Sequence, residues 1–500
     1  MNSTERKEDV ELLPTQMDAY DRVCRILDSH HCYLDFSLMG AGKTFLTVKV
    51  AQHLRIPILV ICPKTVKNVW HKMSKNYRVD IVETLSYESV APRKSRKTGK
   101  PGTAKHGLLN HHPDNIGERK FSMTPKLHNL INSGVLIVFD ECQKVKNLSA
   151  QHYACAILAR AVLGSNLSRF VLLSGSPIDK QEQTINFMHF IGFIVKPKLH
   201  AFYKNKSSFE LLGANDLISV AKSVDKEGTD RFLAENELEK TRNHSTKEVV
   251  TFCHRLFVEV ISPRIVITMP APMAPLDVKN GFYKMSPESR YKLNQALDNL
   301  ATTANNVVSR KIPFGALTPA FRAVEMAKRE IFENCARKTL KYHPNCKVII
   351  FLNFTELLGI LSDALREYNP LIIRGETTDK MRDKYVDDFQ TDPQCRLLIV
   401  TIQTGAMGIS LHDLAGDSPR ISFVSPSHHI QLIHQACYRA ARHGAKSTST
   451  VRNVYGVECE IETKIIDSLS RKGKIMKEVL SQQEKDNIKF PCDYDSEIEP

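Results

Sequence analysis

The stretch from Ser37 to Phe45, which reads SLMGAGKTF, constrains the fold of this chain more than any other. It follows a short apolar run, residues 32–36, and opens a periodic segment from Thr44 to Leu54 that is typical of a helix. A strand, a glycine-bearing turn and a helix form a phosphate-binding loop, because backbone N–H groups and the positive helix end converge on one anion. The pattern therefore predicts a loop that binds nucleotide phosphates.

The residues of this loop have distinct expected roles. Lys43 would reach the β- and γ-phosphates, and the Thr44 hydroxyl would be a ligand of Mg²⁺. Ser37 stands where the pattern GxxxxGK[ST] has its first glycine, so the motif is incomplete. A GKT tripeptide also occurs in ordinary surface loops, which is the alternative interpretation. The residues expected to bind the nucleotide here are Met39, Gly40, Ala41, Gly42, Lys43 and Thr44.

Composition narrows the class of protein. Five hundred residues with 42% hydrophobic content predict two to four domains. A formal charge of +14 favours a polyanionic partner such as nucleic acid, although charge can also serve solubility alone. The 12 cysteines include no CxxC pair, which excludes a zinc ribbon and favours free thiols in a reducing compartment. The polar start and the lack of a long apolar run predict an intracellular soluble protein with no membrane contact.

A second chemical motif follows the apolar run from Gly134 to Phe139, which predicts a buried strand. Asp140 and Glu141 come at its carboxyl end, where open α/β sheets bind their ligands. Asp140 would coordinate Mg²⁺, and Glu141 would polarise an attacking water. An acidic turn after a strand is the alternative, which the phosphate loop upstream makes less favourable.

A third motif follows the apolar run RFVLL, residues 169–173. The run ends in Ser174, Gly175 and Ser176, whose small hydroxyl side chains can sense the state of a bound nucleotide. Alternating strands and helices throughout this half predict a parallel, doubly wound sheet. The pattern also predicts a helix from residue 14 to about 29, with Thr15 as its N-cap.

Two polar regions interrupt the first half of the chain. The sequence of residues 91–122 predicts a basic loop with glycine and proline. One interpretation is a solvated insert. The other is a loop that contacts a phosphate backbone, with Arg93 to Lys105 contributing to the contact. His106, His111 and His112 lack partners at metal-ligand spacing, which argues against a metal site there. Residues 181–341 read as mostly helical insertions and a linker.

The second half alternates again. Its predicted strands are residues 347–352, 370–373, 395–400 and 420–424. The periodic stretch from His428 to Arg442 predicts a helix that carries Gln435, Arg439 and Arg442. The two arginines are three residues apart and would share a helix face. This is either a basic surface helix or a pair of guanidinium groups that reach a γ-phosphate.

These blocks, in this order, resemble the superfamily-two helicase-like ATPases, and more closely their Swi/Snf-type branch. In the first half the similar stretches are ILVICPKTVKNVW, LSYESV, VFDECQKVKN and LLSGSPI. In the second half they are KVIIFLNF, RGETT with Arg382, TGAMGISL, QACYRAARHGAKS and VYGVECEIETKI. The similarity extends over roughly residues 10 to 480.

The resemblance implies an α/β protein with two RecA-like doubly wound parallel-sheet lobes, helical insertions between them, and ATP with Mg²⁺ as cofactors. By analogy Gln16 would read adenine, Gly408 and Gln435 would help to bind the nucleotide, and Arg439 and Arg442 would be arginine fingers. The expected domains are a first lobe over 1–180, helical insertions and a linker over 181–341, a second lobe over 342–480, and an acidic polar tail over 481–500.

Three residues depart from the family pattern: Gln143 replaces a histidine, Ala406 a glycine and Ala445 a glutamine. The expected function is an ATP-dependent motor that translocates on duplex DNA. Its expected location is a nucleus or, for a compact viral member, a virion or host cell. A protein that recruits the motor is a possible partner. One alternative is a true strand-separating helicase on DNA or RNA–DNA hybrids. Another is an ATP-binding scaffold that has lost hydrolysis.

Overall fold

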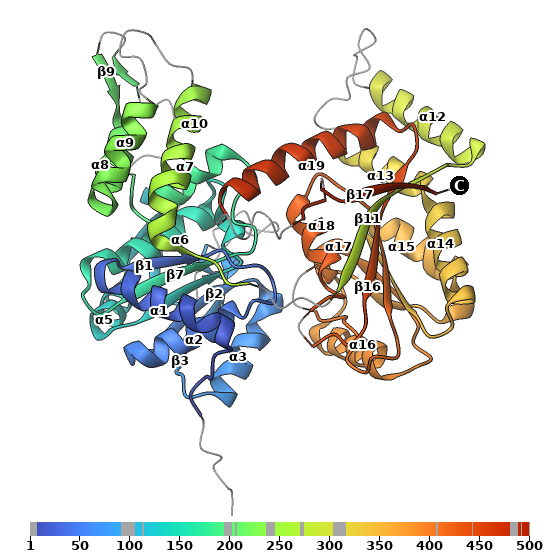
Figure 1. Ribbon diagram of the computed structural model, residues 1–500, viewed down its shortest axis with the longest axis horizontal. Helices are drawn as coiled ribbons and strands as arrows, with labels where there is room; N and C mark the ends of the chain where they lie inside the picture. The colour runs from blue at the N-terminus through green and yellow to red at the C-terminus, as the bar shows by residue number, and fades with distance from the viewer. Residues whose placement is uncertain are drawn as a thin grey trace, which may run out of the picture. The chain divides into compact units, whose positions relative to one another are not determined.

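A computed structural model of the chain describes residues 8–91, 106–112, 115–194, 203–205, 208–236, 246–270, 275–303, 317–406, 409–442, 444–480, 489–491 and 493–499 (Figure 1). The chain divides into two compact units. The first comprises Met1–Ala271 and Ile475–Asn487, and the second comprises Pro272–Lys474 and Ile488–Pro500. Each unit is built around its own parallel sheet.

The first unit contains a six-stranded parallel sheet in the order β10-β1-β7-β6-β2-β3. In β6, Ile137 and Phe139 belong to one hydrophobic cluster, and Leu136 and Val138 belong to another. Since side chains alternate across a strand, both faces of the sheet are buried, which confirms the doubly wound arrangement. The strands are β1 Cys32–Asp35, β2 Ile58–Cys62, β3 Ile81–Ser86, β6 Leu136–Asp140, β7 Arg169–Leu173 and β10 Val266–Ile267.

Helices cover both faces of this sheet. Side chains of α1 Pro14–Ser29, α2 Lys43–Leu54 and α3 Lys67–Asn76 belong to one cluster. Side chains of α4 Tyr87–Val90, α5 Pro125–Ser133, α6 Ala150–Ala161 and α7 Gln181–Phe190 belong to the other. The expected helix at 14–29 is confirmed, but Thr15 as its cap is wrong. Pro14 is the first helical residue, so Thr15 already lies within the first turn.

Further helices of the first unit come from the segment that we expected to separate the lobes. They are α8 Leu212–Val224, α9 Lys226–Glu235, α10 Thr246–Leu256 and α11 Ser262–Ile265, preceded by the hairpin β8 Tyr203–Asn205 and β9 Ser208–Leu211. Phe232 and Phe252 join the core cluster on the α6 face. β10 then pairs with β1, with Leu34 opposite Val266. The segment 181–341 is therefore divided between the two units after residue 271.

The second unit contains a seven-stranded parallel sheet in the order β13-β14-β12-β15-β16-β11-β17. The four strands predicted in this half are all present, within two residues of their expected bounds. The strands are β11 Leu276–Tyr283, β12 Lys347–Leu352, β13 Leu371–Ile373, β14 Leu397–Thr401, β15 Arg420–Val424, β16 Ser449–Gly456 and β17 Asp495–Glu499. The helices are α12 Pro287–Thr303, α13 Leu317–Ala327, α14 Arg329–Tyr342, α15 Thr355–Ala364, α16 Asp379–Thr391, α17 Ile402–Gly405, α18 Ile430–Cys437 and α19 Glu460–Glu478.

The strands β11 and β17 were not predicted, and β17 lies in the segment that we expected to be a polar tail. An ion pair of 3.0 Å joins Lys279 of β11 to Glu497 of β17. Ahead of β17, Phe490 is fully buried and its ring lies 4.9 Å from that of His434 in α18. Charge pairing and one aromatic anchor therefore fix the end of the chain, rather than the apolar alternation by which a strand is recognised in a sequence.

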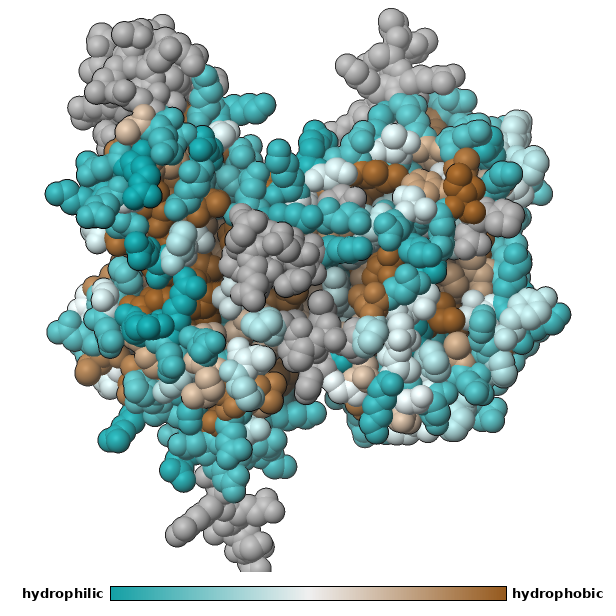
Figure 2. Space-filling model, viewed as in Figure 1, coloured by the Kyte–Doolittle hydropathy of each residue, from teal (hydrophilic) through white to brown (hydrophobic). Residues whose placement is uncertain are grey.

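In the described part of the chain, no helix is long and apolar enough to cross a membrane. Hydrophilic side chains cover most of the face of each unit that Figure 2 shows. The cysteines that the structure describes form no disulfide bonds with one another.

Candidate functional site

The phosphate loop lies directly after β1 and leads into α2. Gly40 and Gly42 have φ angles of 86° and 90°, in the left-handed region that favours glycine. Gly42 is followed at once by Lys43, the first residue of α2. The Lys43 Nζ donates hydrogen bonds to the carbonyl oxygens of Ser37 at 2.8 Å and of Leu38 at 3.0 Å. The ammonium group therefore lies against the loop that it is expected to serve.

Gln16 ties the start of α1 to this loop. Its Nε2 donates to the carbonyl of Ala41 at 2.8 Å, and its Oε1 accepts from the backbone N–H of Leu13 at 2.9 Å. A Cβ atom at Gly42 would lie 2.0 Å from Gln16 Nε2. Glycine at 42 thus serves both the backbone conformation and this close approach.

Ser37, which departs from the usual glycine, has a structural task. Its N–H and hydroxyl both donate to the carboxylate of Asp35 at the end of β1. Its Oγ accepts a hydrogen bond of 2.8 Å from the backbone N–H of Met269, just beyond β10. A glycine could not make these side-chain bonds, so Ser37 joins the phosphate loop to the edge strand of the sheet.

Two aromatic side chains position Asp140, the last residue of β6. The indole N–H of Trp70 donates to Asp140 Oδ2 at 2.9 Å, and the Tyr87 hydroxyl donates to the Asp140 carbonyl oxygen, also at 2.9 Å. Trp70 has 0% of its surface exposed. Sequence analysis placed both residues in family blocks but gave them no task. That Trp70 is the only tryptophan was a signal, but only the fold shows its target.

The environment of Asp140 raises its pKa to about 6, because the carboxyl is buried and Glu141 is adjacent. The Trp70 hydrogen bond and the nearby charge of Lys43 act in the opposite direction and lower the pKa. The carboxyl is therefore neutral below about pH 6 and charged above it. A neutral carboxyl is a poor ligand for Mg²⁺, so we expect ATP turnover to fall as the pH drops through this value.

Trp70→Phe removes a hydrogen bond that stabilises the charged carboxylate. The pKa of Asp140 should rise further, and the acid limb of kcat/KM against pH should move to higher pH by about one unit. Tyr87→Phe is the matched control, because Tyr87 binds the backbone carbonyl and leaves the carboxylate untouched. An unchanged acid limb in Trp70→Phe would contradict this role.

A hydrogen-bonded relay joins Glu141 to the third motif. Gln143 donates through Nε2 to Glu141 Oε2. The Ser174 hydroxyl donates to Gln143 Oε1 at 2.7 Å and accepts from the N–H of Ser176 at 3.0 Å. Sequence analysis treated Gln143 only as a departure from the family pattern. In the structure, its amide connects the acidic pair to the serine loop.

Glu141 has a φ of 56°, which is unusual for a residue with a side chain. Gly175 lies close to the phosphate loop, because a Cβ there would be 3.3 Å from Met39 N and from Ser37 O. The strands β1, β7 and β6 are neighbours in the sheet. Their carboxyl ends therefore bring together the phosphate loop, the serine loop and the acidic pair, as expected for parallel strands.

In the second unit, the expected helix over 428–442 is too long. α18 ends at Cys437, so Arg439 and Arg442 do not share a helix face. The i→i−4 pattern is lost after the helix, since the N–H of Arg439 donates to the carbonyl of Ala436, three residues back. The next carbonyls bind elsewhere in the fold: that of Arg439 accepts from Leu411 N at 3.1 Å, and that of Ala440 accepts from the Ser449 hydroxyl. Tertiary hydrogen bonds thus override the helical periodicity.

Both arginines contact the segment that follows α17. Arg439 is 3% exposed and donates to the carbonyl oxygens of Ile409 and Ala406. Arg442 is half-buried and donates to Ser410 Oγ at 2.7 Å. The structure therefore distinguishes a buried arginine bound to backbone from a more accessible one bound to a hydroxyl.

The other predicted residues are placed as follows. Thr44 is the second residue of α2, next to Lys43. Gln435 is buried in α18. Gly408 and the basic segment from Arg93 to Lys105 lie outside the described residues.

Comparison with known proteins agrees with this arrangement. The family model "Helicase conserved C-terminal domain" matches residues 328–444, which include both arginines. The chain is 23% identical over 468 residues to the putative ATP-dependent RNA helicase L364 of Acanthamoeba polyphaga mimivirus, covering 92% of this chain and 82% of that protein.

It is also 23% identical to the Drosophila melanogaster SWI/SNF-related matrix-associated actin-dependent regulator of chromatin subfamily A-like protein 1. That match covers 80% of this chain but only 47% of the relative, so the chain spans about half of its length. The chain is similar to helicase-like ATPases of superfamily two, Swi/Snf type. One similar solved structure is the Sulfolobus solfataricus SWI2/SNF2 ATPase core in complex with dsDNA, with a TM-score of 0.33 and 16% identity. The match covers 97% of this chain and 98% of that one.

By this similarity the chain is a nucleic-acid-dependent hydrolase of ATP. Its two parallel-sheet units are the RecA-like lobes that the resemblance implies. The residues of the nucleotide site in its first unit fit that class, since a lysine, two carboxylates and two hydroxyl-bearing loops meet at one sheet edge.

Proposed function

We propose that this protein hydrolyses ATP while it translocates along duplex DNA and thereby remodels DNA or protein–DNA complexes. The observation that carries the proposal is the joined set of loops at the ends of β1, β7 and β6. A site that only binds ATP needs the phosphate loop but no relay from a carboxylate to a second loop. A hydrolysing site must transmit the state of its nucleotide to the rest of the protein. The hydrogen bonds from Glu141 through Gln143 to Ser174 provide such a connection.

In the first unit, we assign phosphate binding to Lys43 and the N-terminus of α2. Gln16, at the loop, is placed to contact the base of the nucleotide. Glu141 would orient and polarise the attacking water. Thr44 and Asp140 would hold Mg²⁺, which supplies charge neutralisation at the β- and γ-phosphates. Asp140 Oδ2 is engaged by Trp70, so the orientation of its carboxylate is fixed before any metal binds.

In the second unit, we assign the arginine finger to Arg442 and a positioning task to Arg439. Arg439 has its guanidinium bound to carbonyl oxygens in the interior. Arg442 is exposed enough to exchange its bond with Ser410 for one with a phosphate, a group that guanidinium binds more strongly.

Duplex DNA is proposed as the track on the basis of charge and of one relative. A formal charge of +14 suits a phosphate backbone, and one relative is described as a chromatin regulator. The mimivirus relative is named an RNA helicase and matches 92% of this chain. That match favours a strand-separating helicase that acts on RNA as the second candidate function.

ATPase assays with duplex DNA, single-stranded DNA and RNA separate the two candidates. Duplex DNA of any sequence should stimulate hydrolysis most, because contacts to phosphates carry no sequence information. Stimulation should fall as salt rises, with a log–log slope of binding of about −0.9 per phosphate contact. A third strand annealed to the duplex should be displaced while the duplex stays closed. Unwinding of a forked duplex with strongest stimulation by single strands or RNA would instead establish the helicase.

Gln143→Ala tests whether the relay couples nucleotide state to the track. We expect basal hydrolysis to change little, because the variant retains Lys43, Asp140 and Glu141. Stimulation by duplex DNA should fall by roughly tenfold, about the value of one or two buried hydrogen bonds. Gln183→Ala is a suitable control, since Gln183 binds Asn147 outside the relay. Equal loss of basal and stimulated rates would place Gln143 in catalysis rather than in coupling.

A further inference from the structure

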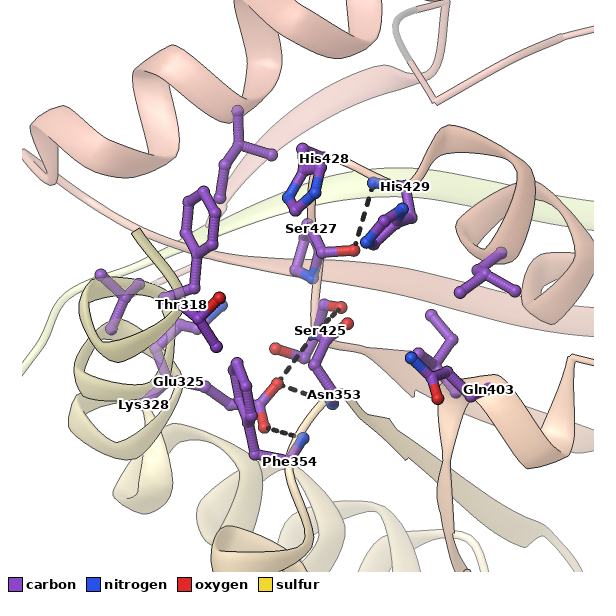
Figure 3. Close-up of a pocket in the computed structure, with 16 residues that line it drawn as sticks. Thr318, Glu325, Lys328, Asn353, Phe354, Gln403, Ser425, Ser427, His428 and His429 are labelled. Carbon is purple, nitrogen blue, oxygen red and sulfur yellow. Dashed lines mark hydrogen bonds between the residues drawn. The ribbon is translucent and has the colours of Figure 1, made fainter. Parts of the chain in front are cut away.

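A cavity of about 230 Å³ lies within the second unit (Figure 3). Its walls come from α13, from the loops after β12 and β15, and from the starts of α17 and α18. The chain passes from β12 to β13 and β14 on one side, and β15 returns to the other side of β12. This reversal is a topological switch point, the place where open α/β sheets bind ligands.

One polar group in the cavity lacks a partner. Ser425 follows β15 and is only 1% exposed. Its N–H donates to Phe351 O, and its carbonyl accepts from Asn353 Nδ2, both at 2.9 Å. Its hydroxyl oxygen has no hydrogen-bond partner among the described residues. A buried hydroxyl left unpaired destabilises the fold, and a hydrogen bond to a bound ligand would relieve this.

The charged side chains of the cavity already have hydrogen-bond or ion-pair partners. Glu325 accepts hydrogen bonds from the backbone N–H groups of Asn353 at 2.8 Å and of Phe354 at 2.9 Å. Lys328 forms a buried ion pair of 2.6 Å with Glu462. Because neither charge is left to neutralise a ligand, an ionic ligand would lose its hydration without compensation. The cavity therefore suits a neutral ligand.

Aromatic rings line one side. Phe321 stacks on His428 with a ring separation of 5.2 Å and an angle of 29°, and His429 follows at 4.0 Å from His428. Figure 3 shows the two histidines and Ser427 along the same edge of the cavity. Rings of this kind stack with other planar rings. The volume is below the roughly 300–1,000 Å³ of pockets for drug-sized molecules, which favours a single ring system.

We propose that this cavity is a second binding site, specific for a neutral planar heteroaromatic ring such as a nucleobase. The ring would stack beside Phe321 and His428 and would hydrogen-bond to Ser425. It could come from a nucleic-acid strand or from a free nucleoside. The strand source rests on the proposed function, whereas the free source does not.

The probe is 2-aminopurine, whose fluorescence falls when it stacks, supplied as a free riboside, within a single strand and within a duplex. Binding is measured to the full chain without ATP. Ser425→Ala should weaken binding by roughly five- to tenfold, and Phe321→Ala by roughly tenfold or more. Ser422→Ala is the matched control: Ser422 is also buried with an unpaired hydroxyl, but it does not line the cavity.

Neither serine substitution removes a hydrogen bond, and each removes an unpaired buried hydroxyl, so neither variant should melt below the parental temperature. Binding of the riboside would identify a free nucleoside as ligand, and binding only of the strand-borne base would identify the strand. The proposal is overturned if no probe binds, or if Ser422→Ala and Ser425→Ala weaken binding equally. Duplex-stimulated hydrolysis is measured separately. If no base binds but duplex DNA still stimulates hydrolysis, the second binding site is rejected and the proposed motor function is not.

Discussion

Lys43→Ala is expected to lower ATP turnover by roughly 10²–10³-fold and to weaken nucleotide binding severely, because the β- and γ-phosphates lose their buried counter-charge. The folded structure should survive. Lys43 is half-buried, and its side chain donates only to the backbone carbonyls of Ser37 and Leu38 within its own loop. Lys49→Ala, six residues further along α2, is the matched control for loss of one lysine in the same helix. Equilibrium nucleotide binding and steady-state turnover are the two measurements.

Glu141→Gln should separate binding from hydrolysis in the same site. The amide is nearly isosteric with the carboxylate, so Lys43, Thr44 and Asp140 still bind nucleotide and metal, but the attacking water is no longer activated. We therefore expect bound ATP to accumulate unhydrolysed. A parental rate of hydrolysis would remove Glu141 from the mechanism. If the parent chain itself binds ATP without hydrolysis under every condition, the scaffold alternative is correct.

Arg442→Ala is expected to lower turnover by roughly 10³–10⁵-fold, the range observed when an arginine finger is removed. The affinity for ATP should change little, because the first unit makes the main contacts. Ser410→Ala removes the partner of Arg442 but leaves its guanidinium in place, so turnover should fall by no more than about tenfold. Near-parental turnover in Arg442→Ala would mean that this segment lies only at the surface.

Arg439→Ala should lower the stability of the fold. The guanidinium of Arg439 is buried and satisfies the carbonyl oxygens of Ile409 and Ala406. Its removal leaves these acceptors unpaired, so the free energy of unfolding should fall by about 2–4 kcal/mol. A lower melting temperature for Arg439→Ala, but not for Arg442→Ala, would show that Arg439 stabilises the segment after α17, which Arg442 also contacts. The sequence assigned one role to both residues, and only their burial separates them.

The sequence by itself determined the elements that are encoded by a pattern of neighbouring residues. Apolar runs such as 58–62 and 348–352 are fully buried strands, because a parallel sheet covered on both faces favours apolar side chains at successive positions. The glycines before Lys43 and the carboxylates after an apolar strand likewise identify their loops without any tertiary information. These patterns were enough for the fold class, and they predict which residues would form a nucleotide site.

The tertiary structure decided the features that depend on residues far apart in the chain. Ser37 is bound by the N–H of Met269, 232 residues away, and Gln143 bridges to Ser174. Strand β17 is fixed by Glu497 against Lys279, and α18 stops where carbonyls of residues 439 and 440 find distant donors. No periodicity encodes such contacts, because a hydrogen bond or ion pair between distant residues forms only once the sheets have brought its two atoms together.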